Sequence, residues 1–421
     1  MIGLWLFGSL AVLLLLGVPI AMALGVAALI CMHLLDVPLA VMGQRIFTSL
    51  DVSSIMAIPF FILAGNLMTT GGISRRLAYF INTMVGRVRG GMAYALVLGC
   101  AFFAALSGSA PATVIAVGSA LYPEVVRLGY PKPRLAGLLA VSGGLGPIIP
   151  PSIFMVVYAT ITNCSVSNLF SAGLVAGAML TFVALGLCLY YSYKEKWPKA
   201  EQRTTVWEMF VAFLRAIPAL MLPLIILGGI YSGLLTPTES ASVATIYAFV
   251  VGIFYYREIS PAESLEIILK SAKNSAMILF IIATSSAFSW VFTFSGISKQ
   301  LVNYILAFNM SATAFCLVVA FVLLVFGTFL EGIAICVLLA PVLWPVAQQL
   351  GVNVVTFGMI FSLGTLIGAL TPPVAVNIFA ASSVTGLKIG EIARGELPFM
   401  LGFTIVFIVF TVFPWFSTFF L

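Results

Sequence analysis

Two short stretches rich in glycine and proline interrupt apolar runs of this chain, at Gly144–Ser152 and at Ile367–Val374. Proline removes a backbone donor and disfavours helical geometry in the residue before it, so each stretch frees several carbonyl groups from the helical hydrogen-bond ladder. Free carbonyls are costly in hydrocarbon unless they are satisfied, and a hard cation with oxygen ligands at about 2.3–2.5 Å satisfies them. Both stretches therefore predict cation sites, although kinks of this kind that bind nothing are also common in membrane helices.

Each stretch has a polar partner earlier in the chain, in the middle of a long apolar run. The partners are SerGlySerAlaProAlaThr at Ser107–Thr113 and PheGlyThrPheLeuGluGly at Phe326–Gly332. The flanking runs are long enough to enter a membrane and return, which predicts two helical hairpins with polar tips. Small hydroxyl residues could also serve only to let helices approach closely. Glu331 differs from them, because a carboxylate in an apolar run is costly and usually functional.

The second half of the chain repeats the first at a spacing of 222 residues. The pair Pro150-Pro151, for example, returns as Pro372-Pro373. Duplicated broken helices in a membrane protein are typical of secondary transporters built from inverted repeats. The predicted fold class is thus an all-α integral membrane protein, an inverted-repeat transporter with two helical hairpins and two broken transmembrane helices.

Composition supports a membrane protein. Hydrophobic residues make up 62% of the 421 residues and charged residues 8%, with a mean hydropathy of +1.19. No soluble domain of this length could keep so much apolar surface from water. At about 20 residues per span, the chain could hold about eleven or twelve membrane-embedded segments. The net charge of +6 then reports the orientation of loops rather than binding to nucleic acid.

Basic residues indicate the cytoplasmic side. Arg89 precedes the first hairpin, and Arg127, Lys132 and Arg134 follow it, whereas the second hairpin has no basic residue at either end. By the positive-inside rule, the first hairpin opens to the cytoplasm and the second to the outside. The same reasoning puts the N-terminus in the periplasm, as the start of a first span rather than of a cleaved signal.

The only long polar stretch divides the repeats. We expect the first repeat at residues 1–193, a cytoplasmic connector at 194–215 and the second repeat at 216–421. Each repeat holds two spans, an amphipathic stretch, a third span, a hairpin, a broken helix and a last span. In the first repeat these are expected at residues 2–14, 19–35, 37–50, 54–70, 92–126, 133–162 and 168–191. In the second they are expected at 216–234, 240–256, 261–273, 274–293, 312–347, a helix broken at 368–373, and 398–420.

The remaining polar groups have simple expected roles. The six cysteines lie in or beside apolar runs without metal-ligand spacing, so they are expected to pack. Glu124 is expected to pair with Arg127, and Glu239 to cap the helix that it begins. His33, the only histidine, is expected at the membrane interface.

Five motifs distributed over essentially the whole chain carry a family resemblance. They are IleProPhePheIleLeuAlaGly (Ile58–Gly65), SerGlySerAlaProAlaThr, ProIleIleProProSer (Pro147–Ser152), LeuThrProThrGluSer (Leu235–Ser240) and GlyAlaLeuThrProProVal. Together they resemble the large membrane subunit of TRAP (tripartite ATP-independent periplasmic) transporters, of the DctM or SiaM type. The resemblance implies a sodium-driven elevator transporter of the bacterial inner membrane, not an enzyme, that accepts an organic anion from a soluble periplasmic binding protein. The anion would be sialic acid, a C4-dicarboxylate or a related sugar acid, and a small membrane subunit of about four helices would be a further partner.

The resemblance also implies site residues. The first of about two sodium sites would use backbone oxygens of Gly146, Ile149 and Pro151. The second sodium site would use Gly327, Thr328, Gly368, Thr371 and Val374. The substrate would contact Ser107, Ser109, Ser152 and Glu331, where many family members carry an aspartate near the second tip. Two bound cations and the hairpin helix N-termini would supply the positive potential that an anion needs.

Two alternatives remain open. A sodium-coupled anion carrier that works without a binding protein would use broken helices in the same way. A binding protein or a small subunit that is required for transport would exclude this alternative. An intramembrane serine hydrolase could use the serine of the first tip as nucleophile. It needs a general base within reach, and His33 belongs to an early span that is unrelated to that hairpin.

Overall fold

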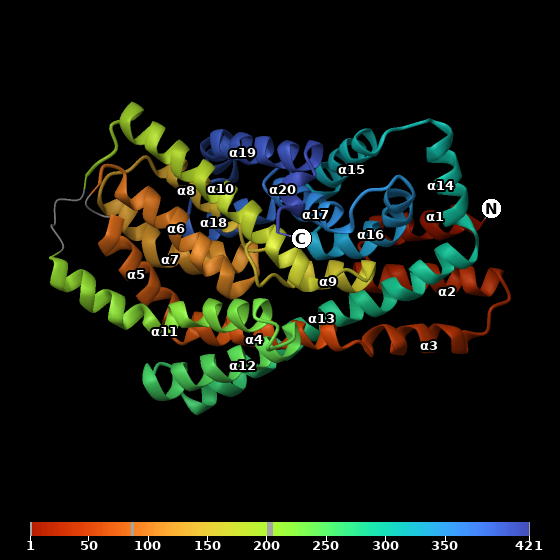
Figure 1. Cartoon of the computed structure of the whole chain (residues 1–421), viewed down its shortest axis with the longest axis horizontal. Coiled ribbons are helices and arrows are strands. Elements are labelled where there is room, and N and C mark those ends of the chain that lie inside the picture. The colour runs from red at the N-terminus through yellow and green to blue at the C-terminus, as the bar shows by residue number, and fades with distance from the viewer. Residues whose placement is uncertain (1, 86–87, 200–204, 421) are drawn as a thin grey trace.

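The apolar runs fold into helices in the computed structural model, which describes residues 2–85, 88–199 and 205–420 (Figure 1). The elements of the first half are α1 (Ile2–Leu15), α2 (Ile20–Leu34), α3 (Leu39–Leu50), η1 (Ser53–Met56), α4 (Ala57–Thr70), α5 (Ile73–Val85), α6 (Gly91–Ser107), α7 (Ala110–Arg127), α8 (Lys132–Gly143), α9 (Ile153–Thr162) and α10 (Val166–Lys194). The elements of the second half are α11 (Val206–Tyr231), α12 (Pro237–Val250), η2 (Val251–Tyr255), α13 (Pro261–Phe294), α14 (Ile297–Ala307), α15 (Ala312–Gly327), α16 (Gly332–Gln349), α17 (Val354–Gly368), α18 (Val376–Thr385), α19 (Ile389–Val412) and α20 (Trp415–Thr418). In the described ranges, pairing of extended backbone is limited to one isolated bridge between Arg89 and Lys199. The all-α prediction is confirmed.

Both predicted hairpins and both predicted breaks are present. Hairpin 1 consists of α6 and α7, which turn at Gly108 in the left-handed conformation (φ +59°). Hairpin 2 consists of α15 and α16. Break 1, residues 144–152, separates α8 from α9, and break 2, residues 369–375, separates α17 from α18. Proline follows shortly after each of the two helix ends, Pro147 after α8 and Pro372 after α17, and proline disfavours continuation of the hydrogen-bond ladder.

The repeat is visible in the backbone as well as in the sequence. Glycines with positive φ stand at equivalent turns of the two halves, as the pairs Gly17 and Gly233, Gly72 and Gly296, and Gly129 and Gly351. Glycine is the residue that adopts this conformation at no steric cost. The two halves therefore turn at the same places.

Two predicted roles of acidic residues are confirmed. Glu239 closes a capping box at the start of α12: its Oε2 accepts a hydrogen bond from Thr236 N at 2.7 Å, and its own N–H donates to Thr236 Oγ1 at 3.3 Å. Glu124 forms an ion pair with Arg127 one turn later on α7. Neither carboxylate is therefore free for a ligand.

Several helices differ from the prediction. The amphipathic stretch 261–273 and the span 274–293 are one 34-residue helix, α13, because no glycine or proline follows Pro261 to interrupt it. Helix α11 begins at Val206 rather than at 216, where Thr205 forms a capping box with Glu208. The short helices α5 and α14, at equivalent places just before the two hairpins, were not predicted at all.

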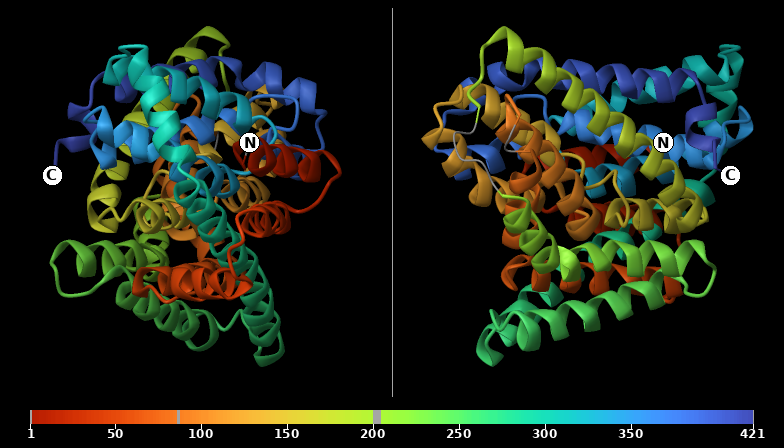
Figure 2. Two further views of the ribbon diagram at one scale, coloured as in Figure 1. Left: turned by 90° about the vertical axis from the view of Figure 1, so that its right-hand side faces the viewer. Right: turned by 60° about the vertical axis from the view of Figure 1, so that its left-hand side comes forward.

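The helices form two layers. Figures 1 and 2 show α11 and α12 (green) together with α3 and α4 (red and orange) as a lower layer, in which α12 packs on α4. The upper layer holds the hairpins and the broken helices, and α8 packs on α19 there while α15 packs on α17. Hairpin 1 lies on the left of Figure 1 and hairpin 2 on the right. The hairpins thus approach the centre from opposite ends, as an inverted repeat requires.

Within the described ranges, seven helices are long and apolar enough to cross a membrane. An eighth span is obtained if α14 and α15, which are bent by 119° relative to each other, count as one. Six further apolar helices, among them α6, α9, α17 and α18, are shorter. The eleven or twelve segments that composition predicts are membrane-embedded segments, which include arms of hairpins and halves of broken helices as well as complete spans.

Candidate functional site

Each hairpin tip crosses its own break at close backbone contact. A Cβ atom placed on Gly146 would lie 2.5 Å from the carbonyl carbon of Ser109. A Cβ atom placed on Gly368 would lie 2.5 Å from the Cα atom of Gly327. Only glycine permits such an approach. The pairing of tip and break that the sequence predicts is therefore present in both halves.

A cavity of about 320 Å³ lies where the tips and breaks meet. Hairpin 1 contributes residues 107–112 and hairpin 2 contributes residues 331–333, while α4 and α13 line it from the lower layer. The polar lining residues are Asn66, Thr69, Ser107, Ser109, Asn274, Glu331, Thr365 and Asn377. A cavity of this size, with a few polar groups among apolar ones, suits a small organic ligand.

The two serines at the tip of hairpin 1 are not equivalent. The hydroxyl of Ser107 lies 2.9 Å from the hydroxyl of Thr113 and donates to the carbonyl of Ser109 at 3.2 Å. Ser107 is 8% exposed and Thr113 fully buried, so these two hydroxyls shape the tip. Within the described residues, Ser109 forms its hydrogen bonds through its main chain alone. Its hydroxyl is thus the one available to a ligand in the cavity.

Ser152 and Glu331 both cap helices that begin at the cavity. Ser152 is fully buried outside the cavity lining, and its hydroxyl donates to the carbonyl of Pro147 at 2.7 Å and accepts from Met155 N at 3.3 Å. Glu331 lines the cavity, and its Oε2 accepts hydrogen bonds from the first N–H groups of α16 at 3.1 and 3.3 Å. Its negative charge therefore faces the positive end of that helix.

Break 1 exposes the carbonyl groups that the sequence predicts. In the part of the chain that the structure describes, the carbonyls of Gly146, Ile149 and Pro151 accept no hydrogen bond. The Ile149 side chain packs against α10, where a Cβ atom on Gly177 would lie 2.5 Å from its Cγ1. Three oxygens without protein partners in a buried, broken helix suit a hard cation.

Break 2 has a similar set of oxygens, partly used by the protein. Among the described residues, the carbonyls of Gly327, Thr371 and Val374 accept no hydrogen bond. The carbonyl of Thr328 accepts from Val374 N at 3.2 Å, and that of Gly368 accepts from Thr371 N at 2.9 Å. The hydroxyl of Thr371 donates to Ile367 O at 2.9 Å, which leaves its oxygen lone pairs available.

The structure adds polar groups that the sequence reasoning missed. Asn377 follows break 2, lines the cavity and is 1% exposed, yet neither its Oδ1 nor its Nδ2 has a partner among the described residues. Asn66 lies on the opposite wall, and its amide donates to Ser271 Oγ at 2.8 Å. Glu396, on α19, is 1% exposed and its Oε2 has no partner in the described chain. A search for any amide or carboxylate within apolar runs would have found these residues.

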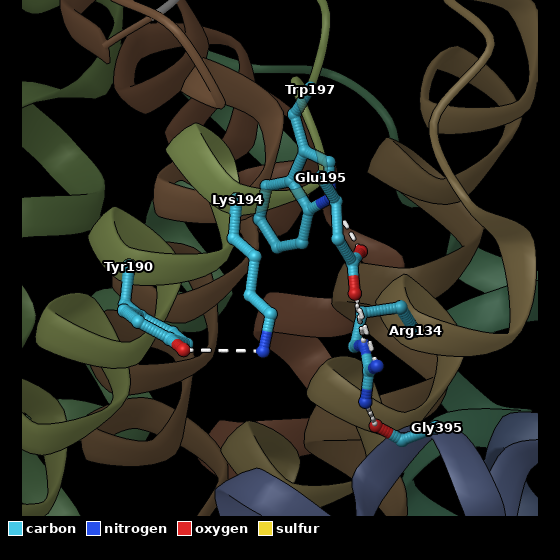
Figure 3. A network of polar contacts seen from close by, with 6 residues as sticks. All are labelled: Arg134, Tyr190, Lys194, Glu195, Trp197 and Gly395. Atoms are coloured by element: carbon cyan, nitrogen blue, oxygen red, sulfur yellow. Dashed lines mark hydrogen bonds and ion pairs between the residues drawn. The ribbon is translucent and has the colours of Figure 1, made fainter.

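The segment after α10 is fixed to helices of the upper layer (Figure 3). Arg134 forms an ion pair with Glu195 at 3.0 Å and donates to the carbonyl of Gly395 at 3.3 Å, which joins α8, α10 and α19. Trp197 is 1% exposed and donates from its indole to Glu195 at 2.9 Å. The start of the expected connector is therefore ordered, while residues 200–204 of it lie outside the described residues.

Among the described residues, the lining of the cavity beside the tip serines contains no histidine, lysine or cysteine. His33 is exposed near the end of α2. The described cysteines are free and mostly buried, as expected for packing residues. A nucleophile at the tip would have no general base of these types in the cavity.

Comparisons with known proteins agree with this architecture. Residues 7–416 match the family described as the DctM component of tripartite ATP-independent periplasmic transporters. The chain is 42% identical to the C4-dicarboxylate TRAP transporter large permease protein DctM of Pseudomonas aeruginosa, over 88% of this chain and 86% of that protein. It is 32% identical to the sialic acid TRAP transporter large permease protein SiaM of Vibrio cholerae, over 89% of this chain and 88% of that protein.

A solved structure has a similar fold. The crystal structure of the Alcanivorax borkumensis YdaH transporter superposes with a TM-score of 0.65 at 15% identity, over 89% of this chain and 87% of that one. This likeness concerns the fold alone. The family match and the two relatives show that the chain belongs to the DctM family of tripartite ATP-independent periplasmic transporters, as a multi-pass membrane permease subunit rather than an enzyme.

Proposed function

We propose that this chain is the permease of a sodium-driven secondary transporter that imports an organic anion by an elevator movement. The observation that carries the proposal is the duplicated crossing of a hairpin tip and a broken helix around one cavity. Inverted repeats with broken helices at a central cavity are the architecture by which secondary transporters bind solute and coupling ions together.

Two sodium ions would bind, one at each crossing. The first would use the carbonyls of Gly146, Ile149 and Pro151, which accept no hydrogen bond within the described chain. The second would use Gly327, Thr328, Gly368, Thr371 and Val374. Of these residues, Gly327, Thr371 and Val374 have carbonyl oxygens that accept no hydrogen bond in the described chain. Backbone oxygens without charge suit a monovalent cation that must bind and be released again.

The solute would be a small organic anion such as a C4-dicarboxylate or sialic acid, the substrates for which two relatives are named. Ser107, Ser109, Ser152 and Glu331 are the predicted substrate residues. Ser109 would be the direct contact, because its hydroxyl has no partner in the described chain, whereas Ser152 lies outside the cavity lining. An anion would be weakly held by neutral groups in a cavity of low dielectric constant. Sodium would therefore bind first and make the cavity positive enough for the anion.

The moving unit would be the upper layer, and the lower layer would remain fixed in the membrane. A soluble periplasmic binding protein would deliver the anion, and a small four-helix membrane subunit would cover apolar faces of the fixed layer. The complex would lie in the bacterial inner membrane, with the N-terminus and the mouth of hairpin 2 on the periplasmic side. A carrier that needs no binding protein is the alternative.

The test is uptake into proteoliposomes that hold the permease and its small subunit, with a binding protein loaded with labelled anion outside. A sodium gradient should drive accumulation without ATP, because the sequence has no phosphate-binding loop. Equal uptake with potassium in place of sodium would refute sodium coupling. Uptake of free anion at the same rate without the binding protein would favour the stand-alone carrier.

A further inference from the structure

Four helix N-termini face the central cavity, and two of them are capped by their own side chains. The lining includes first-turn residues of α7, α9, α16 and α18. Ser152 caps α9 and Glu331 caps α16. At the start of α7 and of α18, Ser109 and Ala375 provide no side-chain cap. The helices α7 and α18 pack against each other, and their positive ends are the two without a side-chain cap.

Main-chain donors stand free at these two ends. The N–H groups of Ala110, Ala112 and Val376 donate to no acceptor in the described chain, and all three residues line the cavity. Pro111 between the first two has no N–H to contribute. Donors at a helix start that point to a cavity form a ready anion site.

Asn377 is the second and independent sign of a ligand. Its side chain is 1% exposed, belongs to the cavity lining, and has neither amide atom satisfied by the described residues. An unsatisfied buried amide costs free energy, so native proteins rarely keep one without a partner. A Cβ atom on Gly144 would lie 3.1 Å from its Nδ2, so Asn377 also borders break 1.

We propose that a carboxylate of the transported solute binds between the N-termini of α7 and α18, held by the Asn377 amide and the Ser109 hydroxyl. This inference rests on the proposed function and specifies which part of the cavity takes the charged group. The available groups there include several donors: main-chain N–H groups, one hydroxyl and the Nδ2 of the Asn377 amide, whose Oδ1 is also without a partner in the described chain. A carboxylate accepts such hydrogen bonds, and charge-assisted ones are the stronger kind.

Glu331 fixes the orientation of the solute. Its carboxylate already occupies the N-terminus of α16, so a solute anion is excluded there by like charge. The solute carboxylate is thus directed to the hairpin 1 side. The uncharged part of a sugar acid, or the far end of a dicarboxylate, then extends toward α4 and α13, where Asn66 and Asn274 line the wall.

The experiment compares Asn377→Leu, Asn377→Ser and Asn377→Asp in the sodium-driven proteoliposome assay with the complete transporter. Succinate and N-acetylneuraminate are the probes, each loaded on the binding protein. At the same sodium concentration, Asn377→Leu should lower uptake at least about tenfold relative to the wild-type protein, as expected for a lost hydrogen bond to a charged group. Asn377→Ser should retain part of the activity because serine keeps a hydrogen-bond donor. Asn377→Asp should be the most impaired because it adds a negative charge that repels the solute carboxylate. The sodium concentration for half-maximal uptake should stay unchanged in Asn377→Leu and Asn377→Ser.

Asn353→Asp is the matched control. Asn353 caps α17 through its Oδ1, a role that aspartate keeps, and it lies at the far end of this 15-residue helix from break 2. The variant adds the same charge outside the cavity and should transport normally. If the wild-type protein takes up neither probe with sodium, the proposed function is wrong. If it does, and Asn377→Leu or Asn377→Ser transports at the wild-type rate, or changes only its sodium dependence, the carboxylate subsite is wrong.

Discussion

The contact between Gly327 and Gly368 sets the distance between hairpin 2 and break 2, and Gly368→Ala is the sharpest test of it. The added Cβ would lie 2.5 Å from Gly327 Cα, 3.0 Å from Gly327 C and 3.2 Å from Leu323 O. Ordinary van der Waals contact begins near 3.4 Å. The two backbones must therefore separate by about 1 Å, since neither neighbour is a flexible side chain, and such overpacking costs about 1–3 kcal/mol.

The same separation of the two backbones by about 1 Å determines the effect of Gly368→Ala on the proposed ion site. Oxygen ligands bind a hard cation within a narrow distance range, so a separation of about 1 Å removes at least one ligand from the shell. We expect the sodium concentration for half-maximal uptake to rise about tenfold or more, with a lower melting temperature. The assay is sodium-dependent uptake by proteoliposomes, beside thermal unfolding of the solubilised protein. Gly186→Ala is the matched control, because a Cβ on Gly186, within α10, meets nothing within 4 Å.

Two results would refute this reasoning. One is Gly368→Ala with wild-type sodium dependence, which would show that the backbones of hairpin 2 and break 2 hold no ion between them. The other is an equal defect in Gly186→Ala, since alanine in an open helix position should instead stabilise by about 0.5–1 kcal/mol. Gly146→Ala should act like Gly368→Ala, because its Cβ would lie 2.5 Å from the carbonyl carbon of Ser109. A defect in one half alone would argue against two equivalent sites.

Three further predictions concern a hydroxyl at break 2, a buried tryptophan and the membrane sides of the two hairpins. Thr371→Val keeps the volume but removes the hydroxyl, and it should raise the half-saturating sodium concentration about tenfold; unaltered sodium dependence in an uptake assay would show that this hydroxyl only bonds back to Ile367 O. Trp197→Ala removes a side chain that is 1% exposed and should lower the melting temperature by about 5 °C or more, whereas Trp207→Ala, at a residue 71% exposed, should not. Cysteines at the exposed positions Lys132 and Asn353 should react with an impermeant thiol reagent from the cytoplasmic and the periplasmic side respectively; labelling of both from one side would contradict the inverted repeat.

The parts of the fold that the sequence predicts well are those that single residues decide locally. Pro150-Pro151 and Pro372-Pro373 lie in the two breaks, and the missing donor and the steric restriction that disfavour a helix there belong to proline itself. Glu239 caps α12 through Thr236, three residues before it, so a short window of sequence contains the whole interaction. The two hairpins are predicted in the same way, from the length of each apolar run and from the turn residues in its middle.

The missed features depend on what lies across space. Helix α13 continues through residues where the first repeat has separate α3 and α4, and the sequence pattern of an amphipathic stretch followed by a span does not distinguish these outcomes. The role of Asn377 depends on the cavity and on Gly144 in the other repeat. Ser107 and Ser109 have the same side chain two residues apart, and only the position of Thr113 decides which hydroxyl is engaged.

The two halves of the chain are alike at the two proposed ion sites, but they differ in the side chains at the two hairpin tips, where the solute would bind. At each crossing the close contact is made by backbone atoms, Gly146 on Ser109 and Gly368 on Gly327, and backbone oxygens are retained when side chains diverge. Charge recognition is instead a matter of side chains, and here the halves differ. The second tip ends in Glu331, which caps its own helix, while the first ends in Ser109, which leaves its helix open. Duplication would therefore account for the proposed pair of ion sites, and the difference between these tip residues would give the solute a single orientation in the cavity.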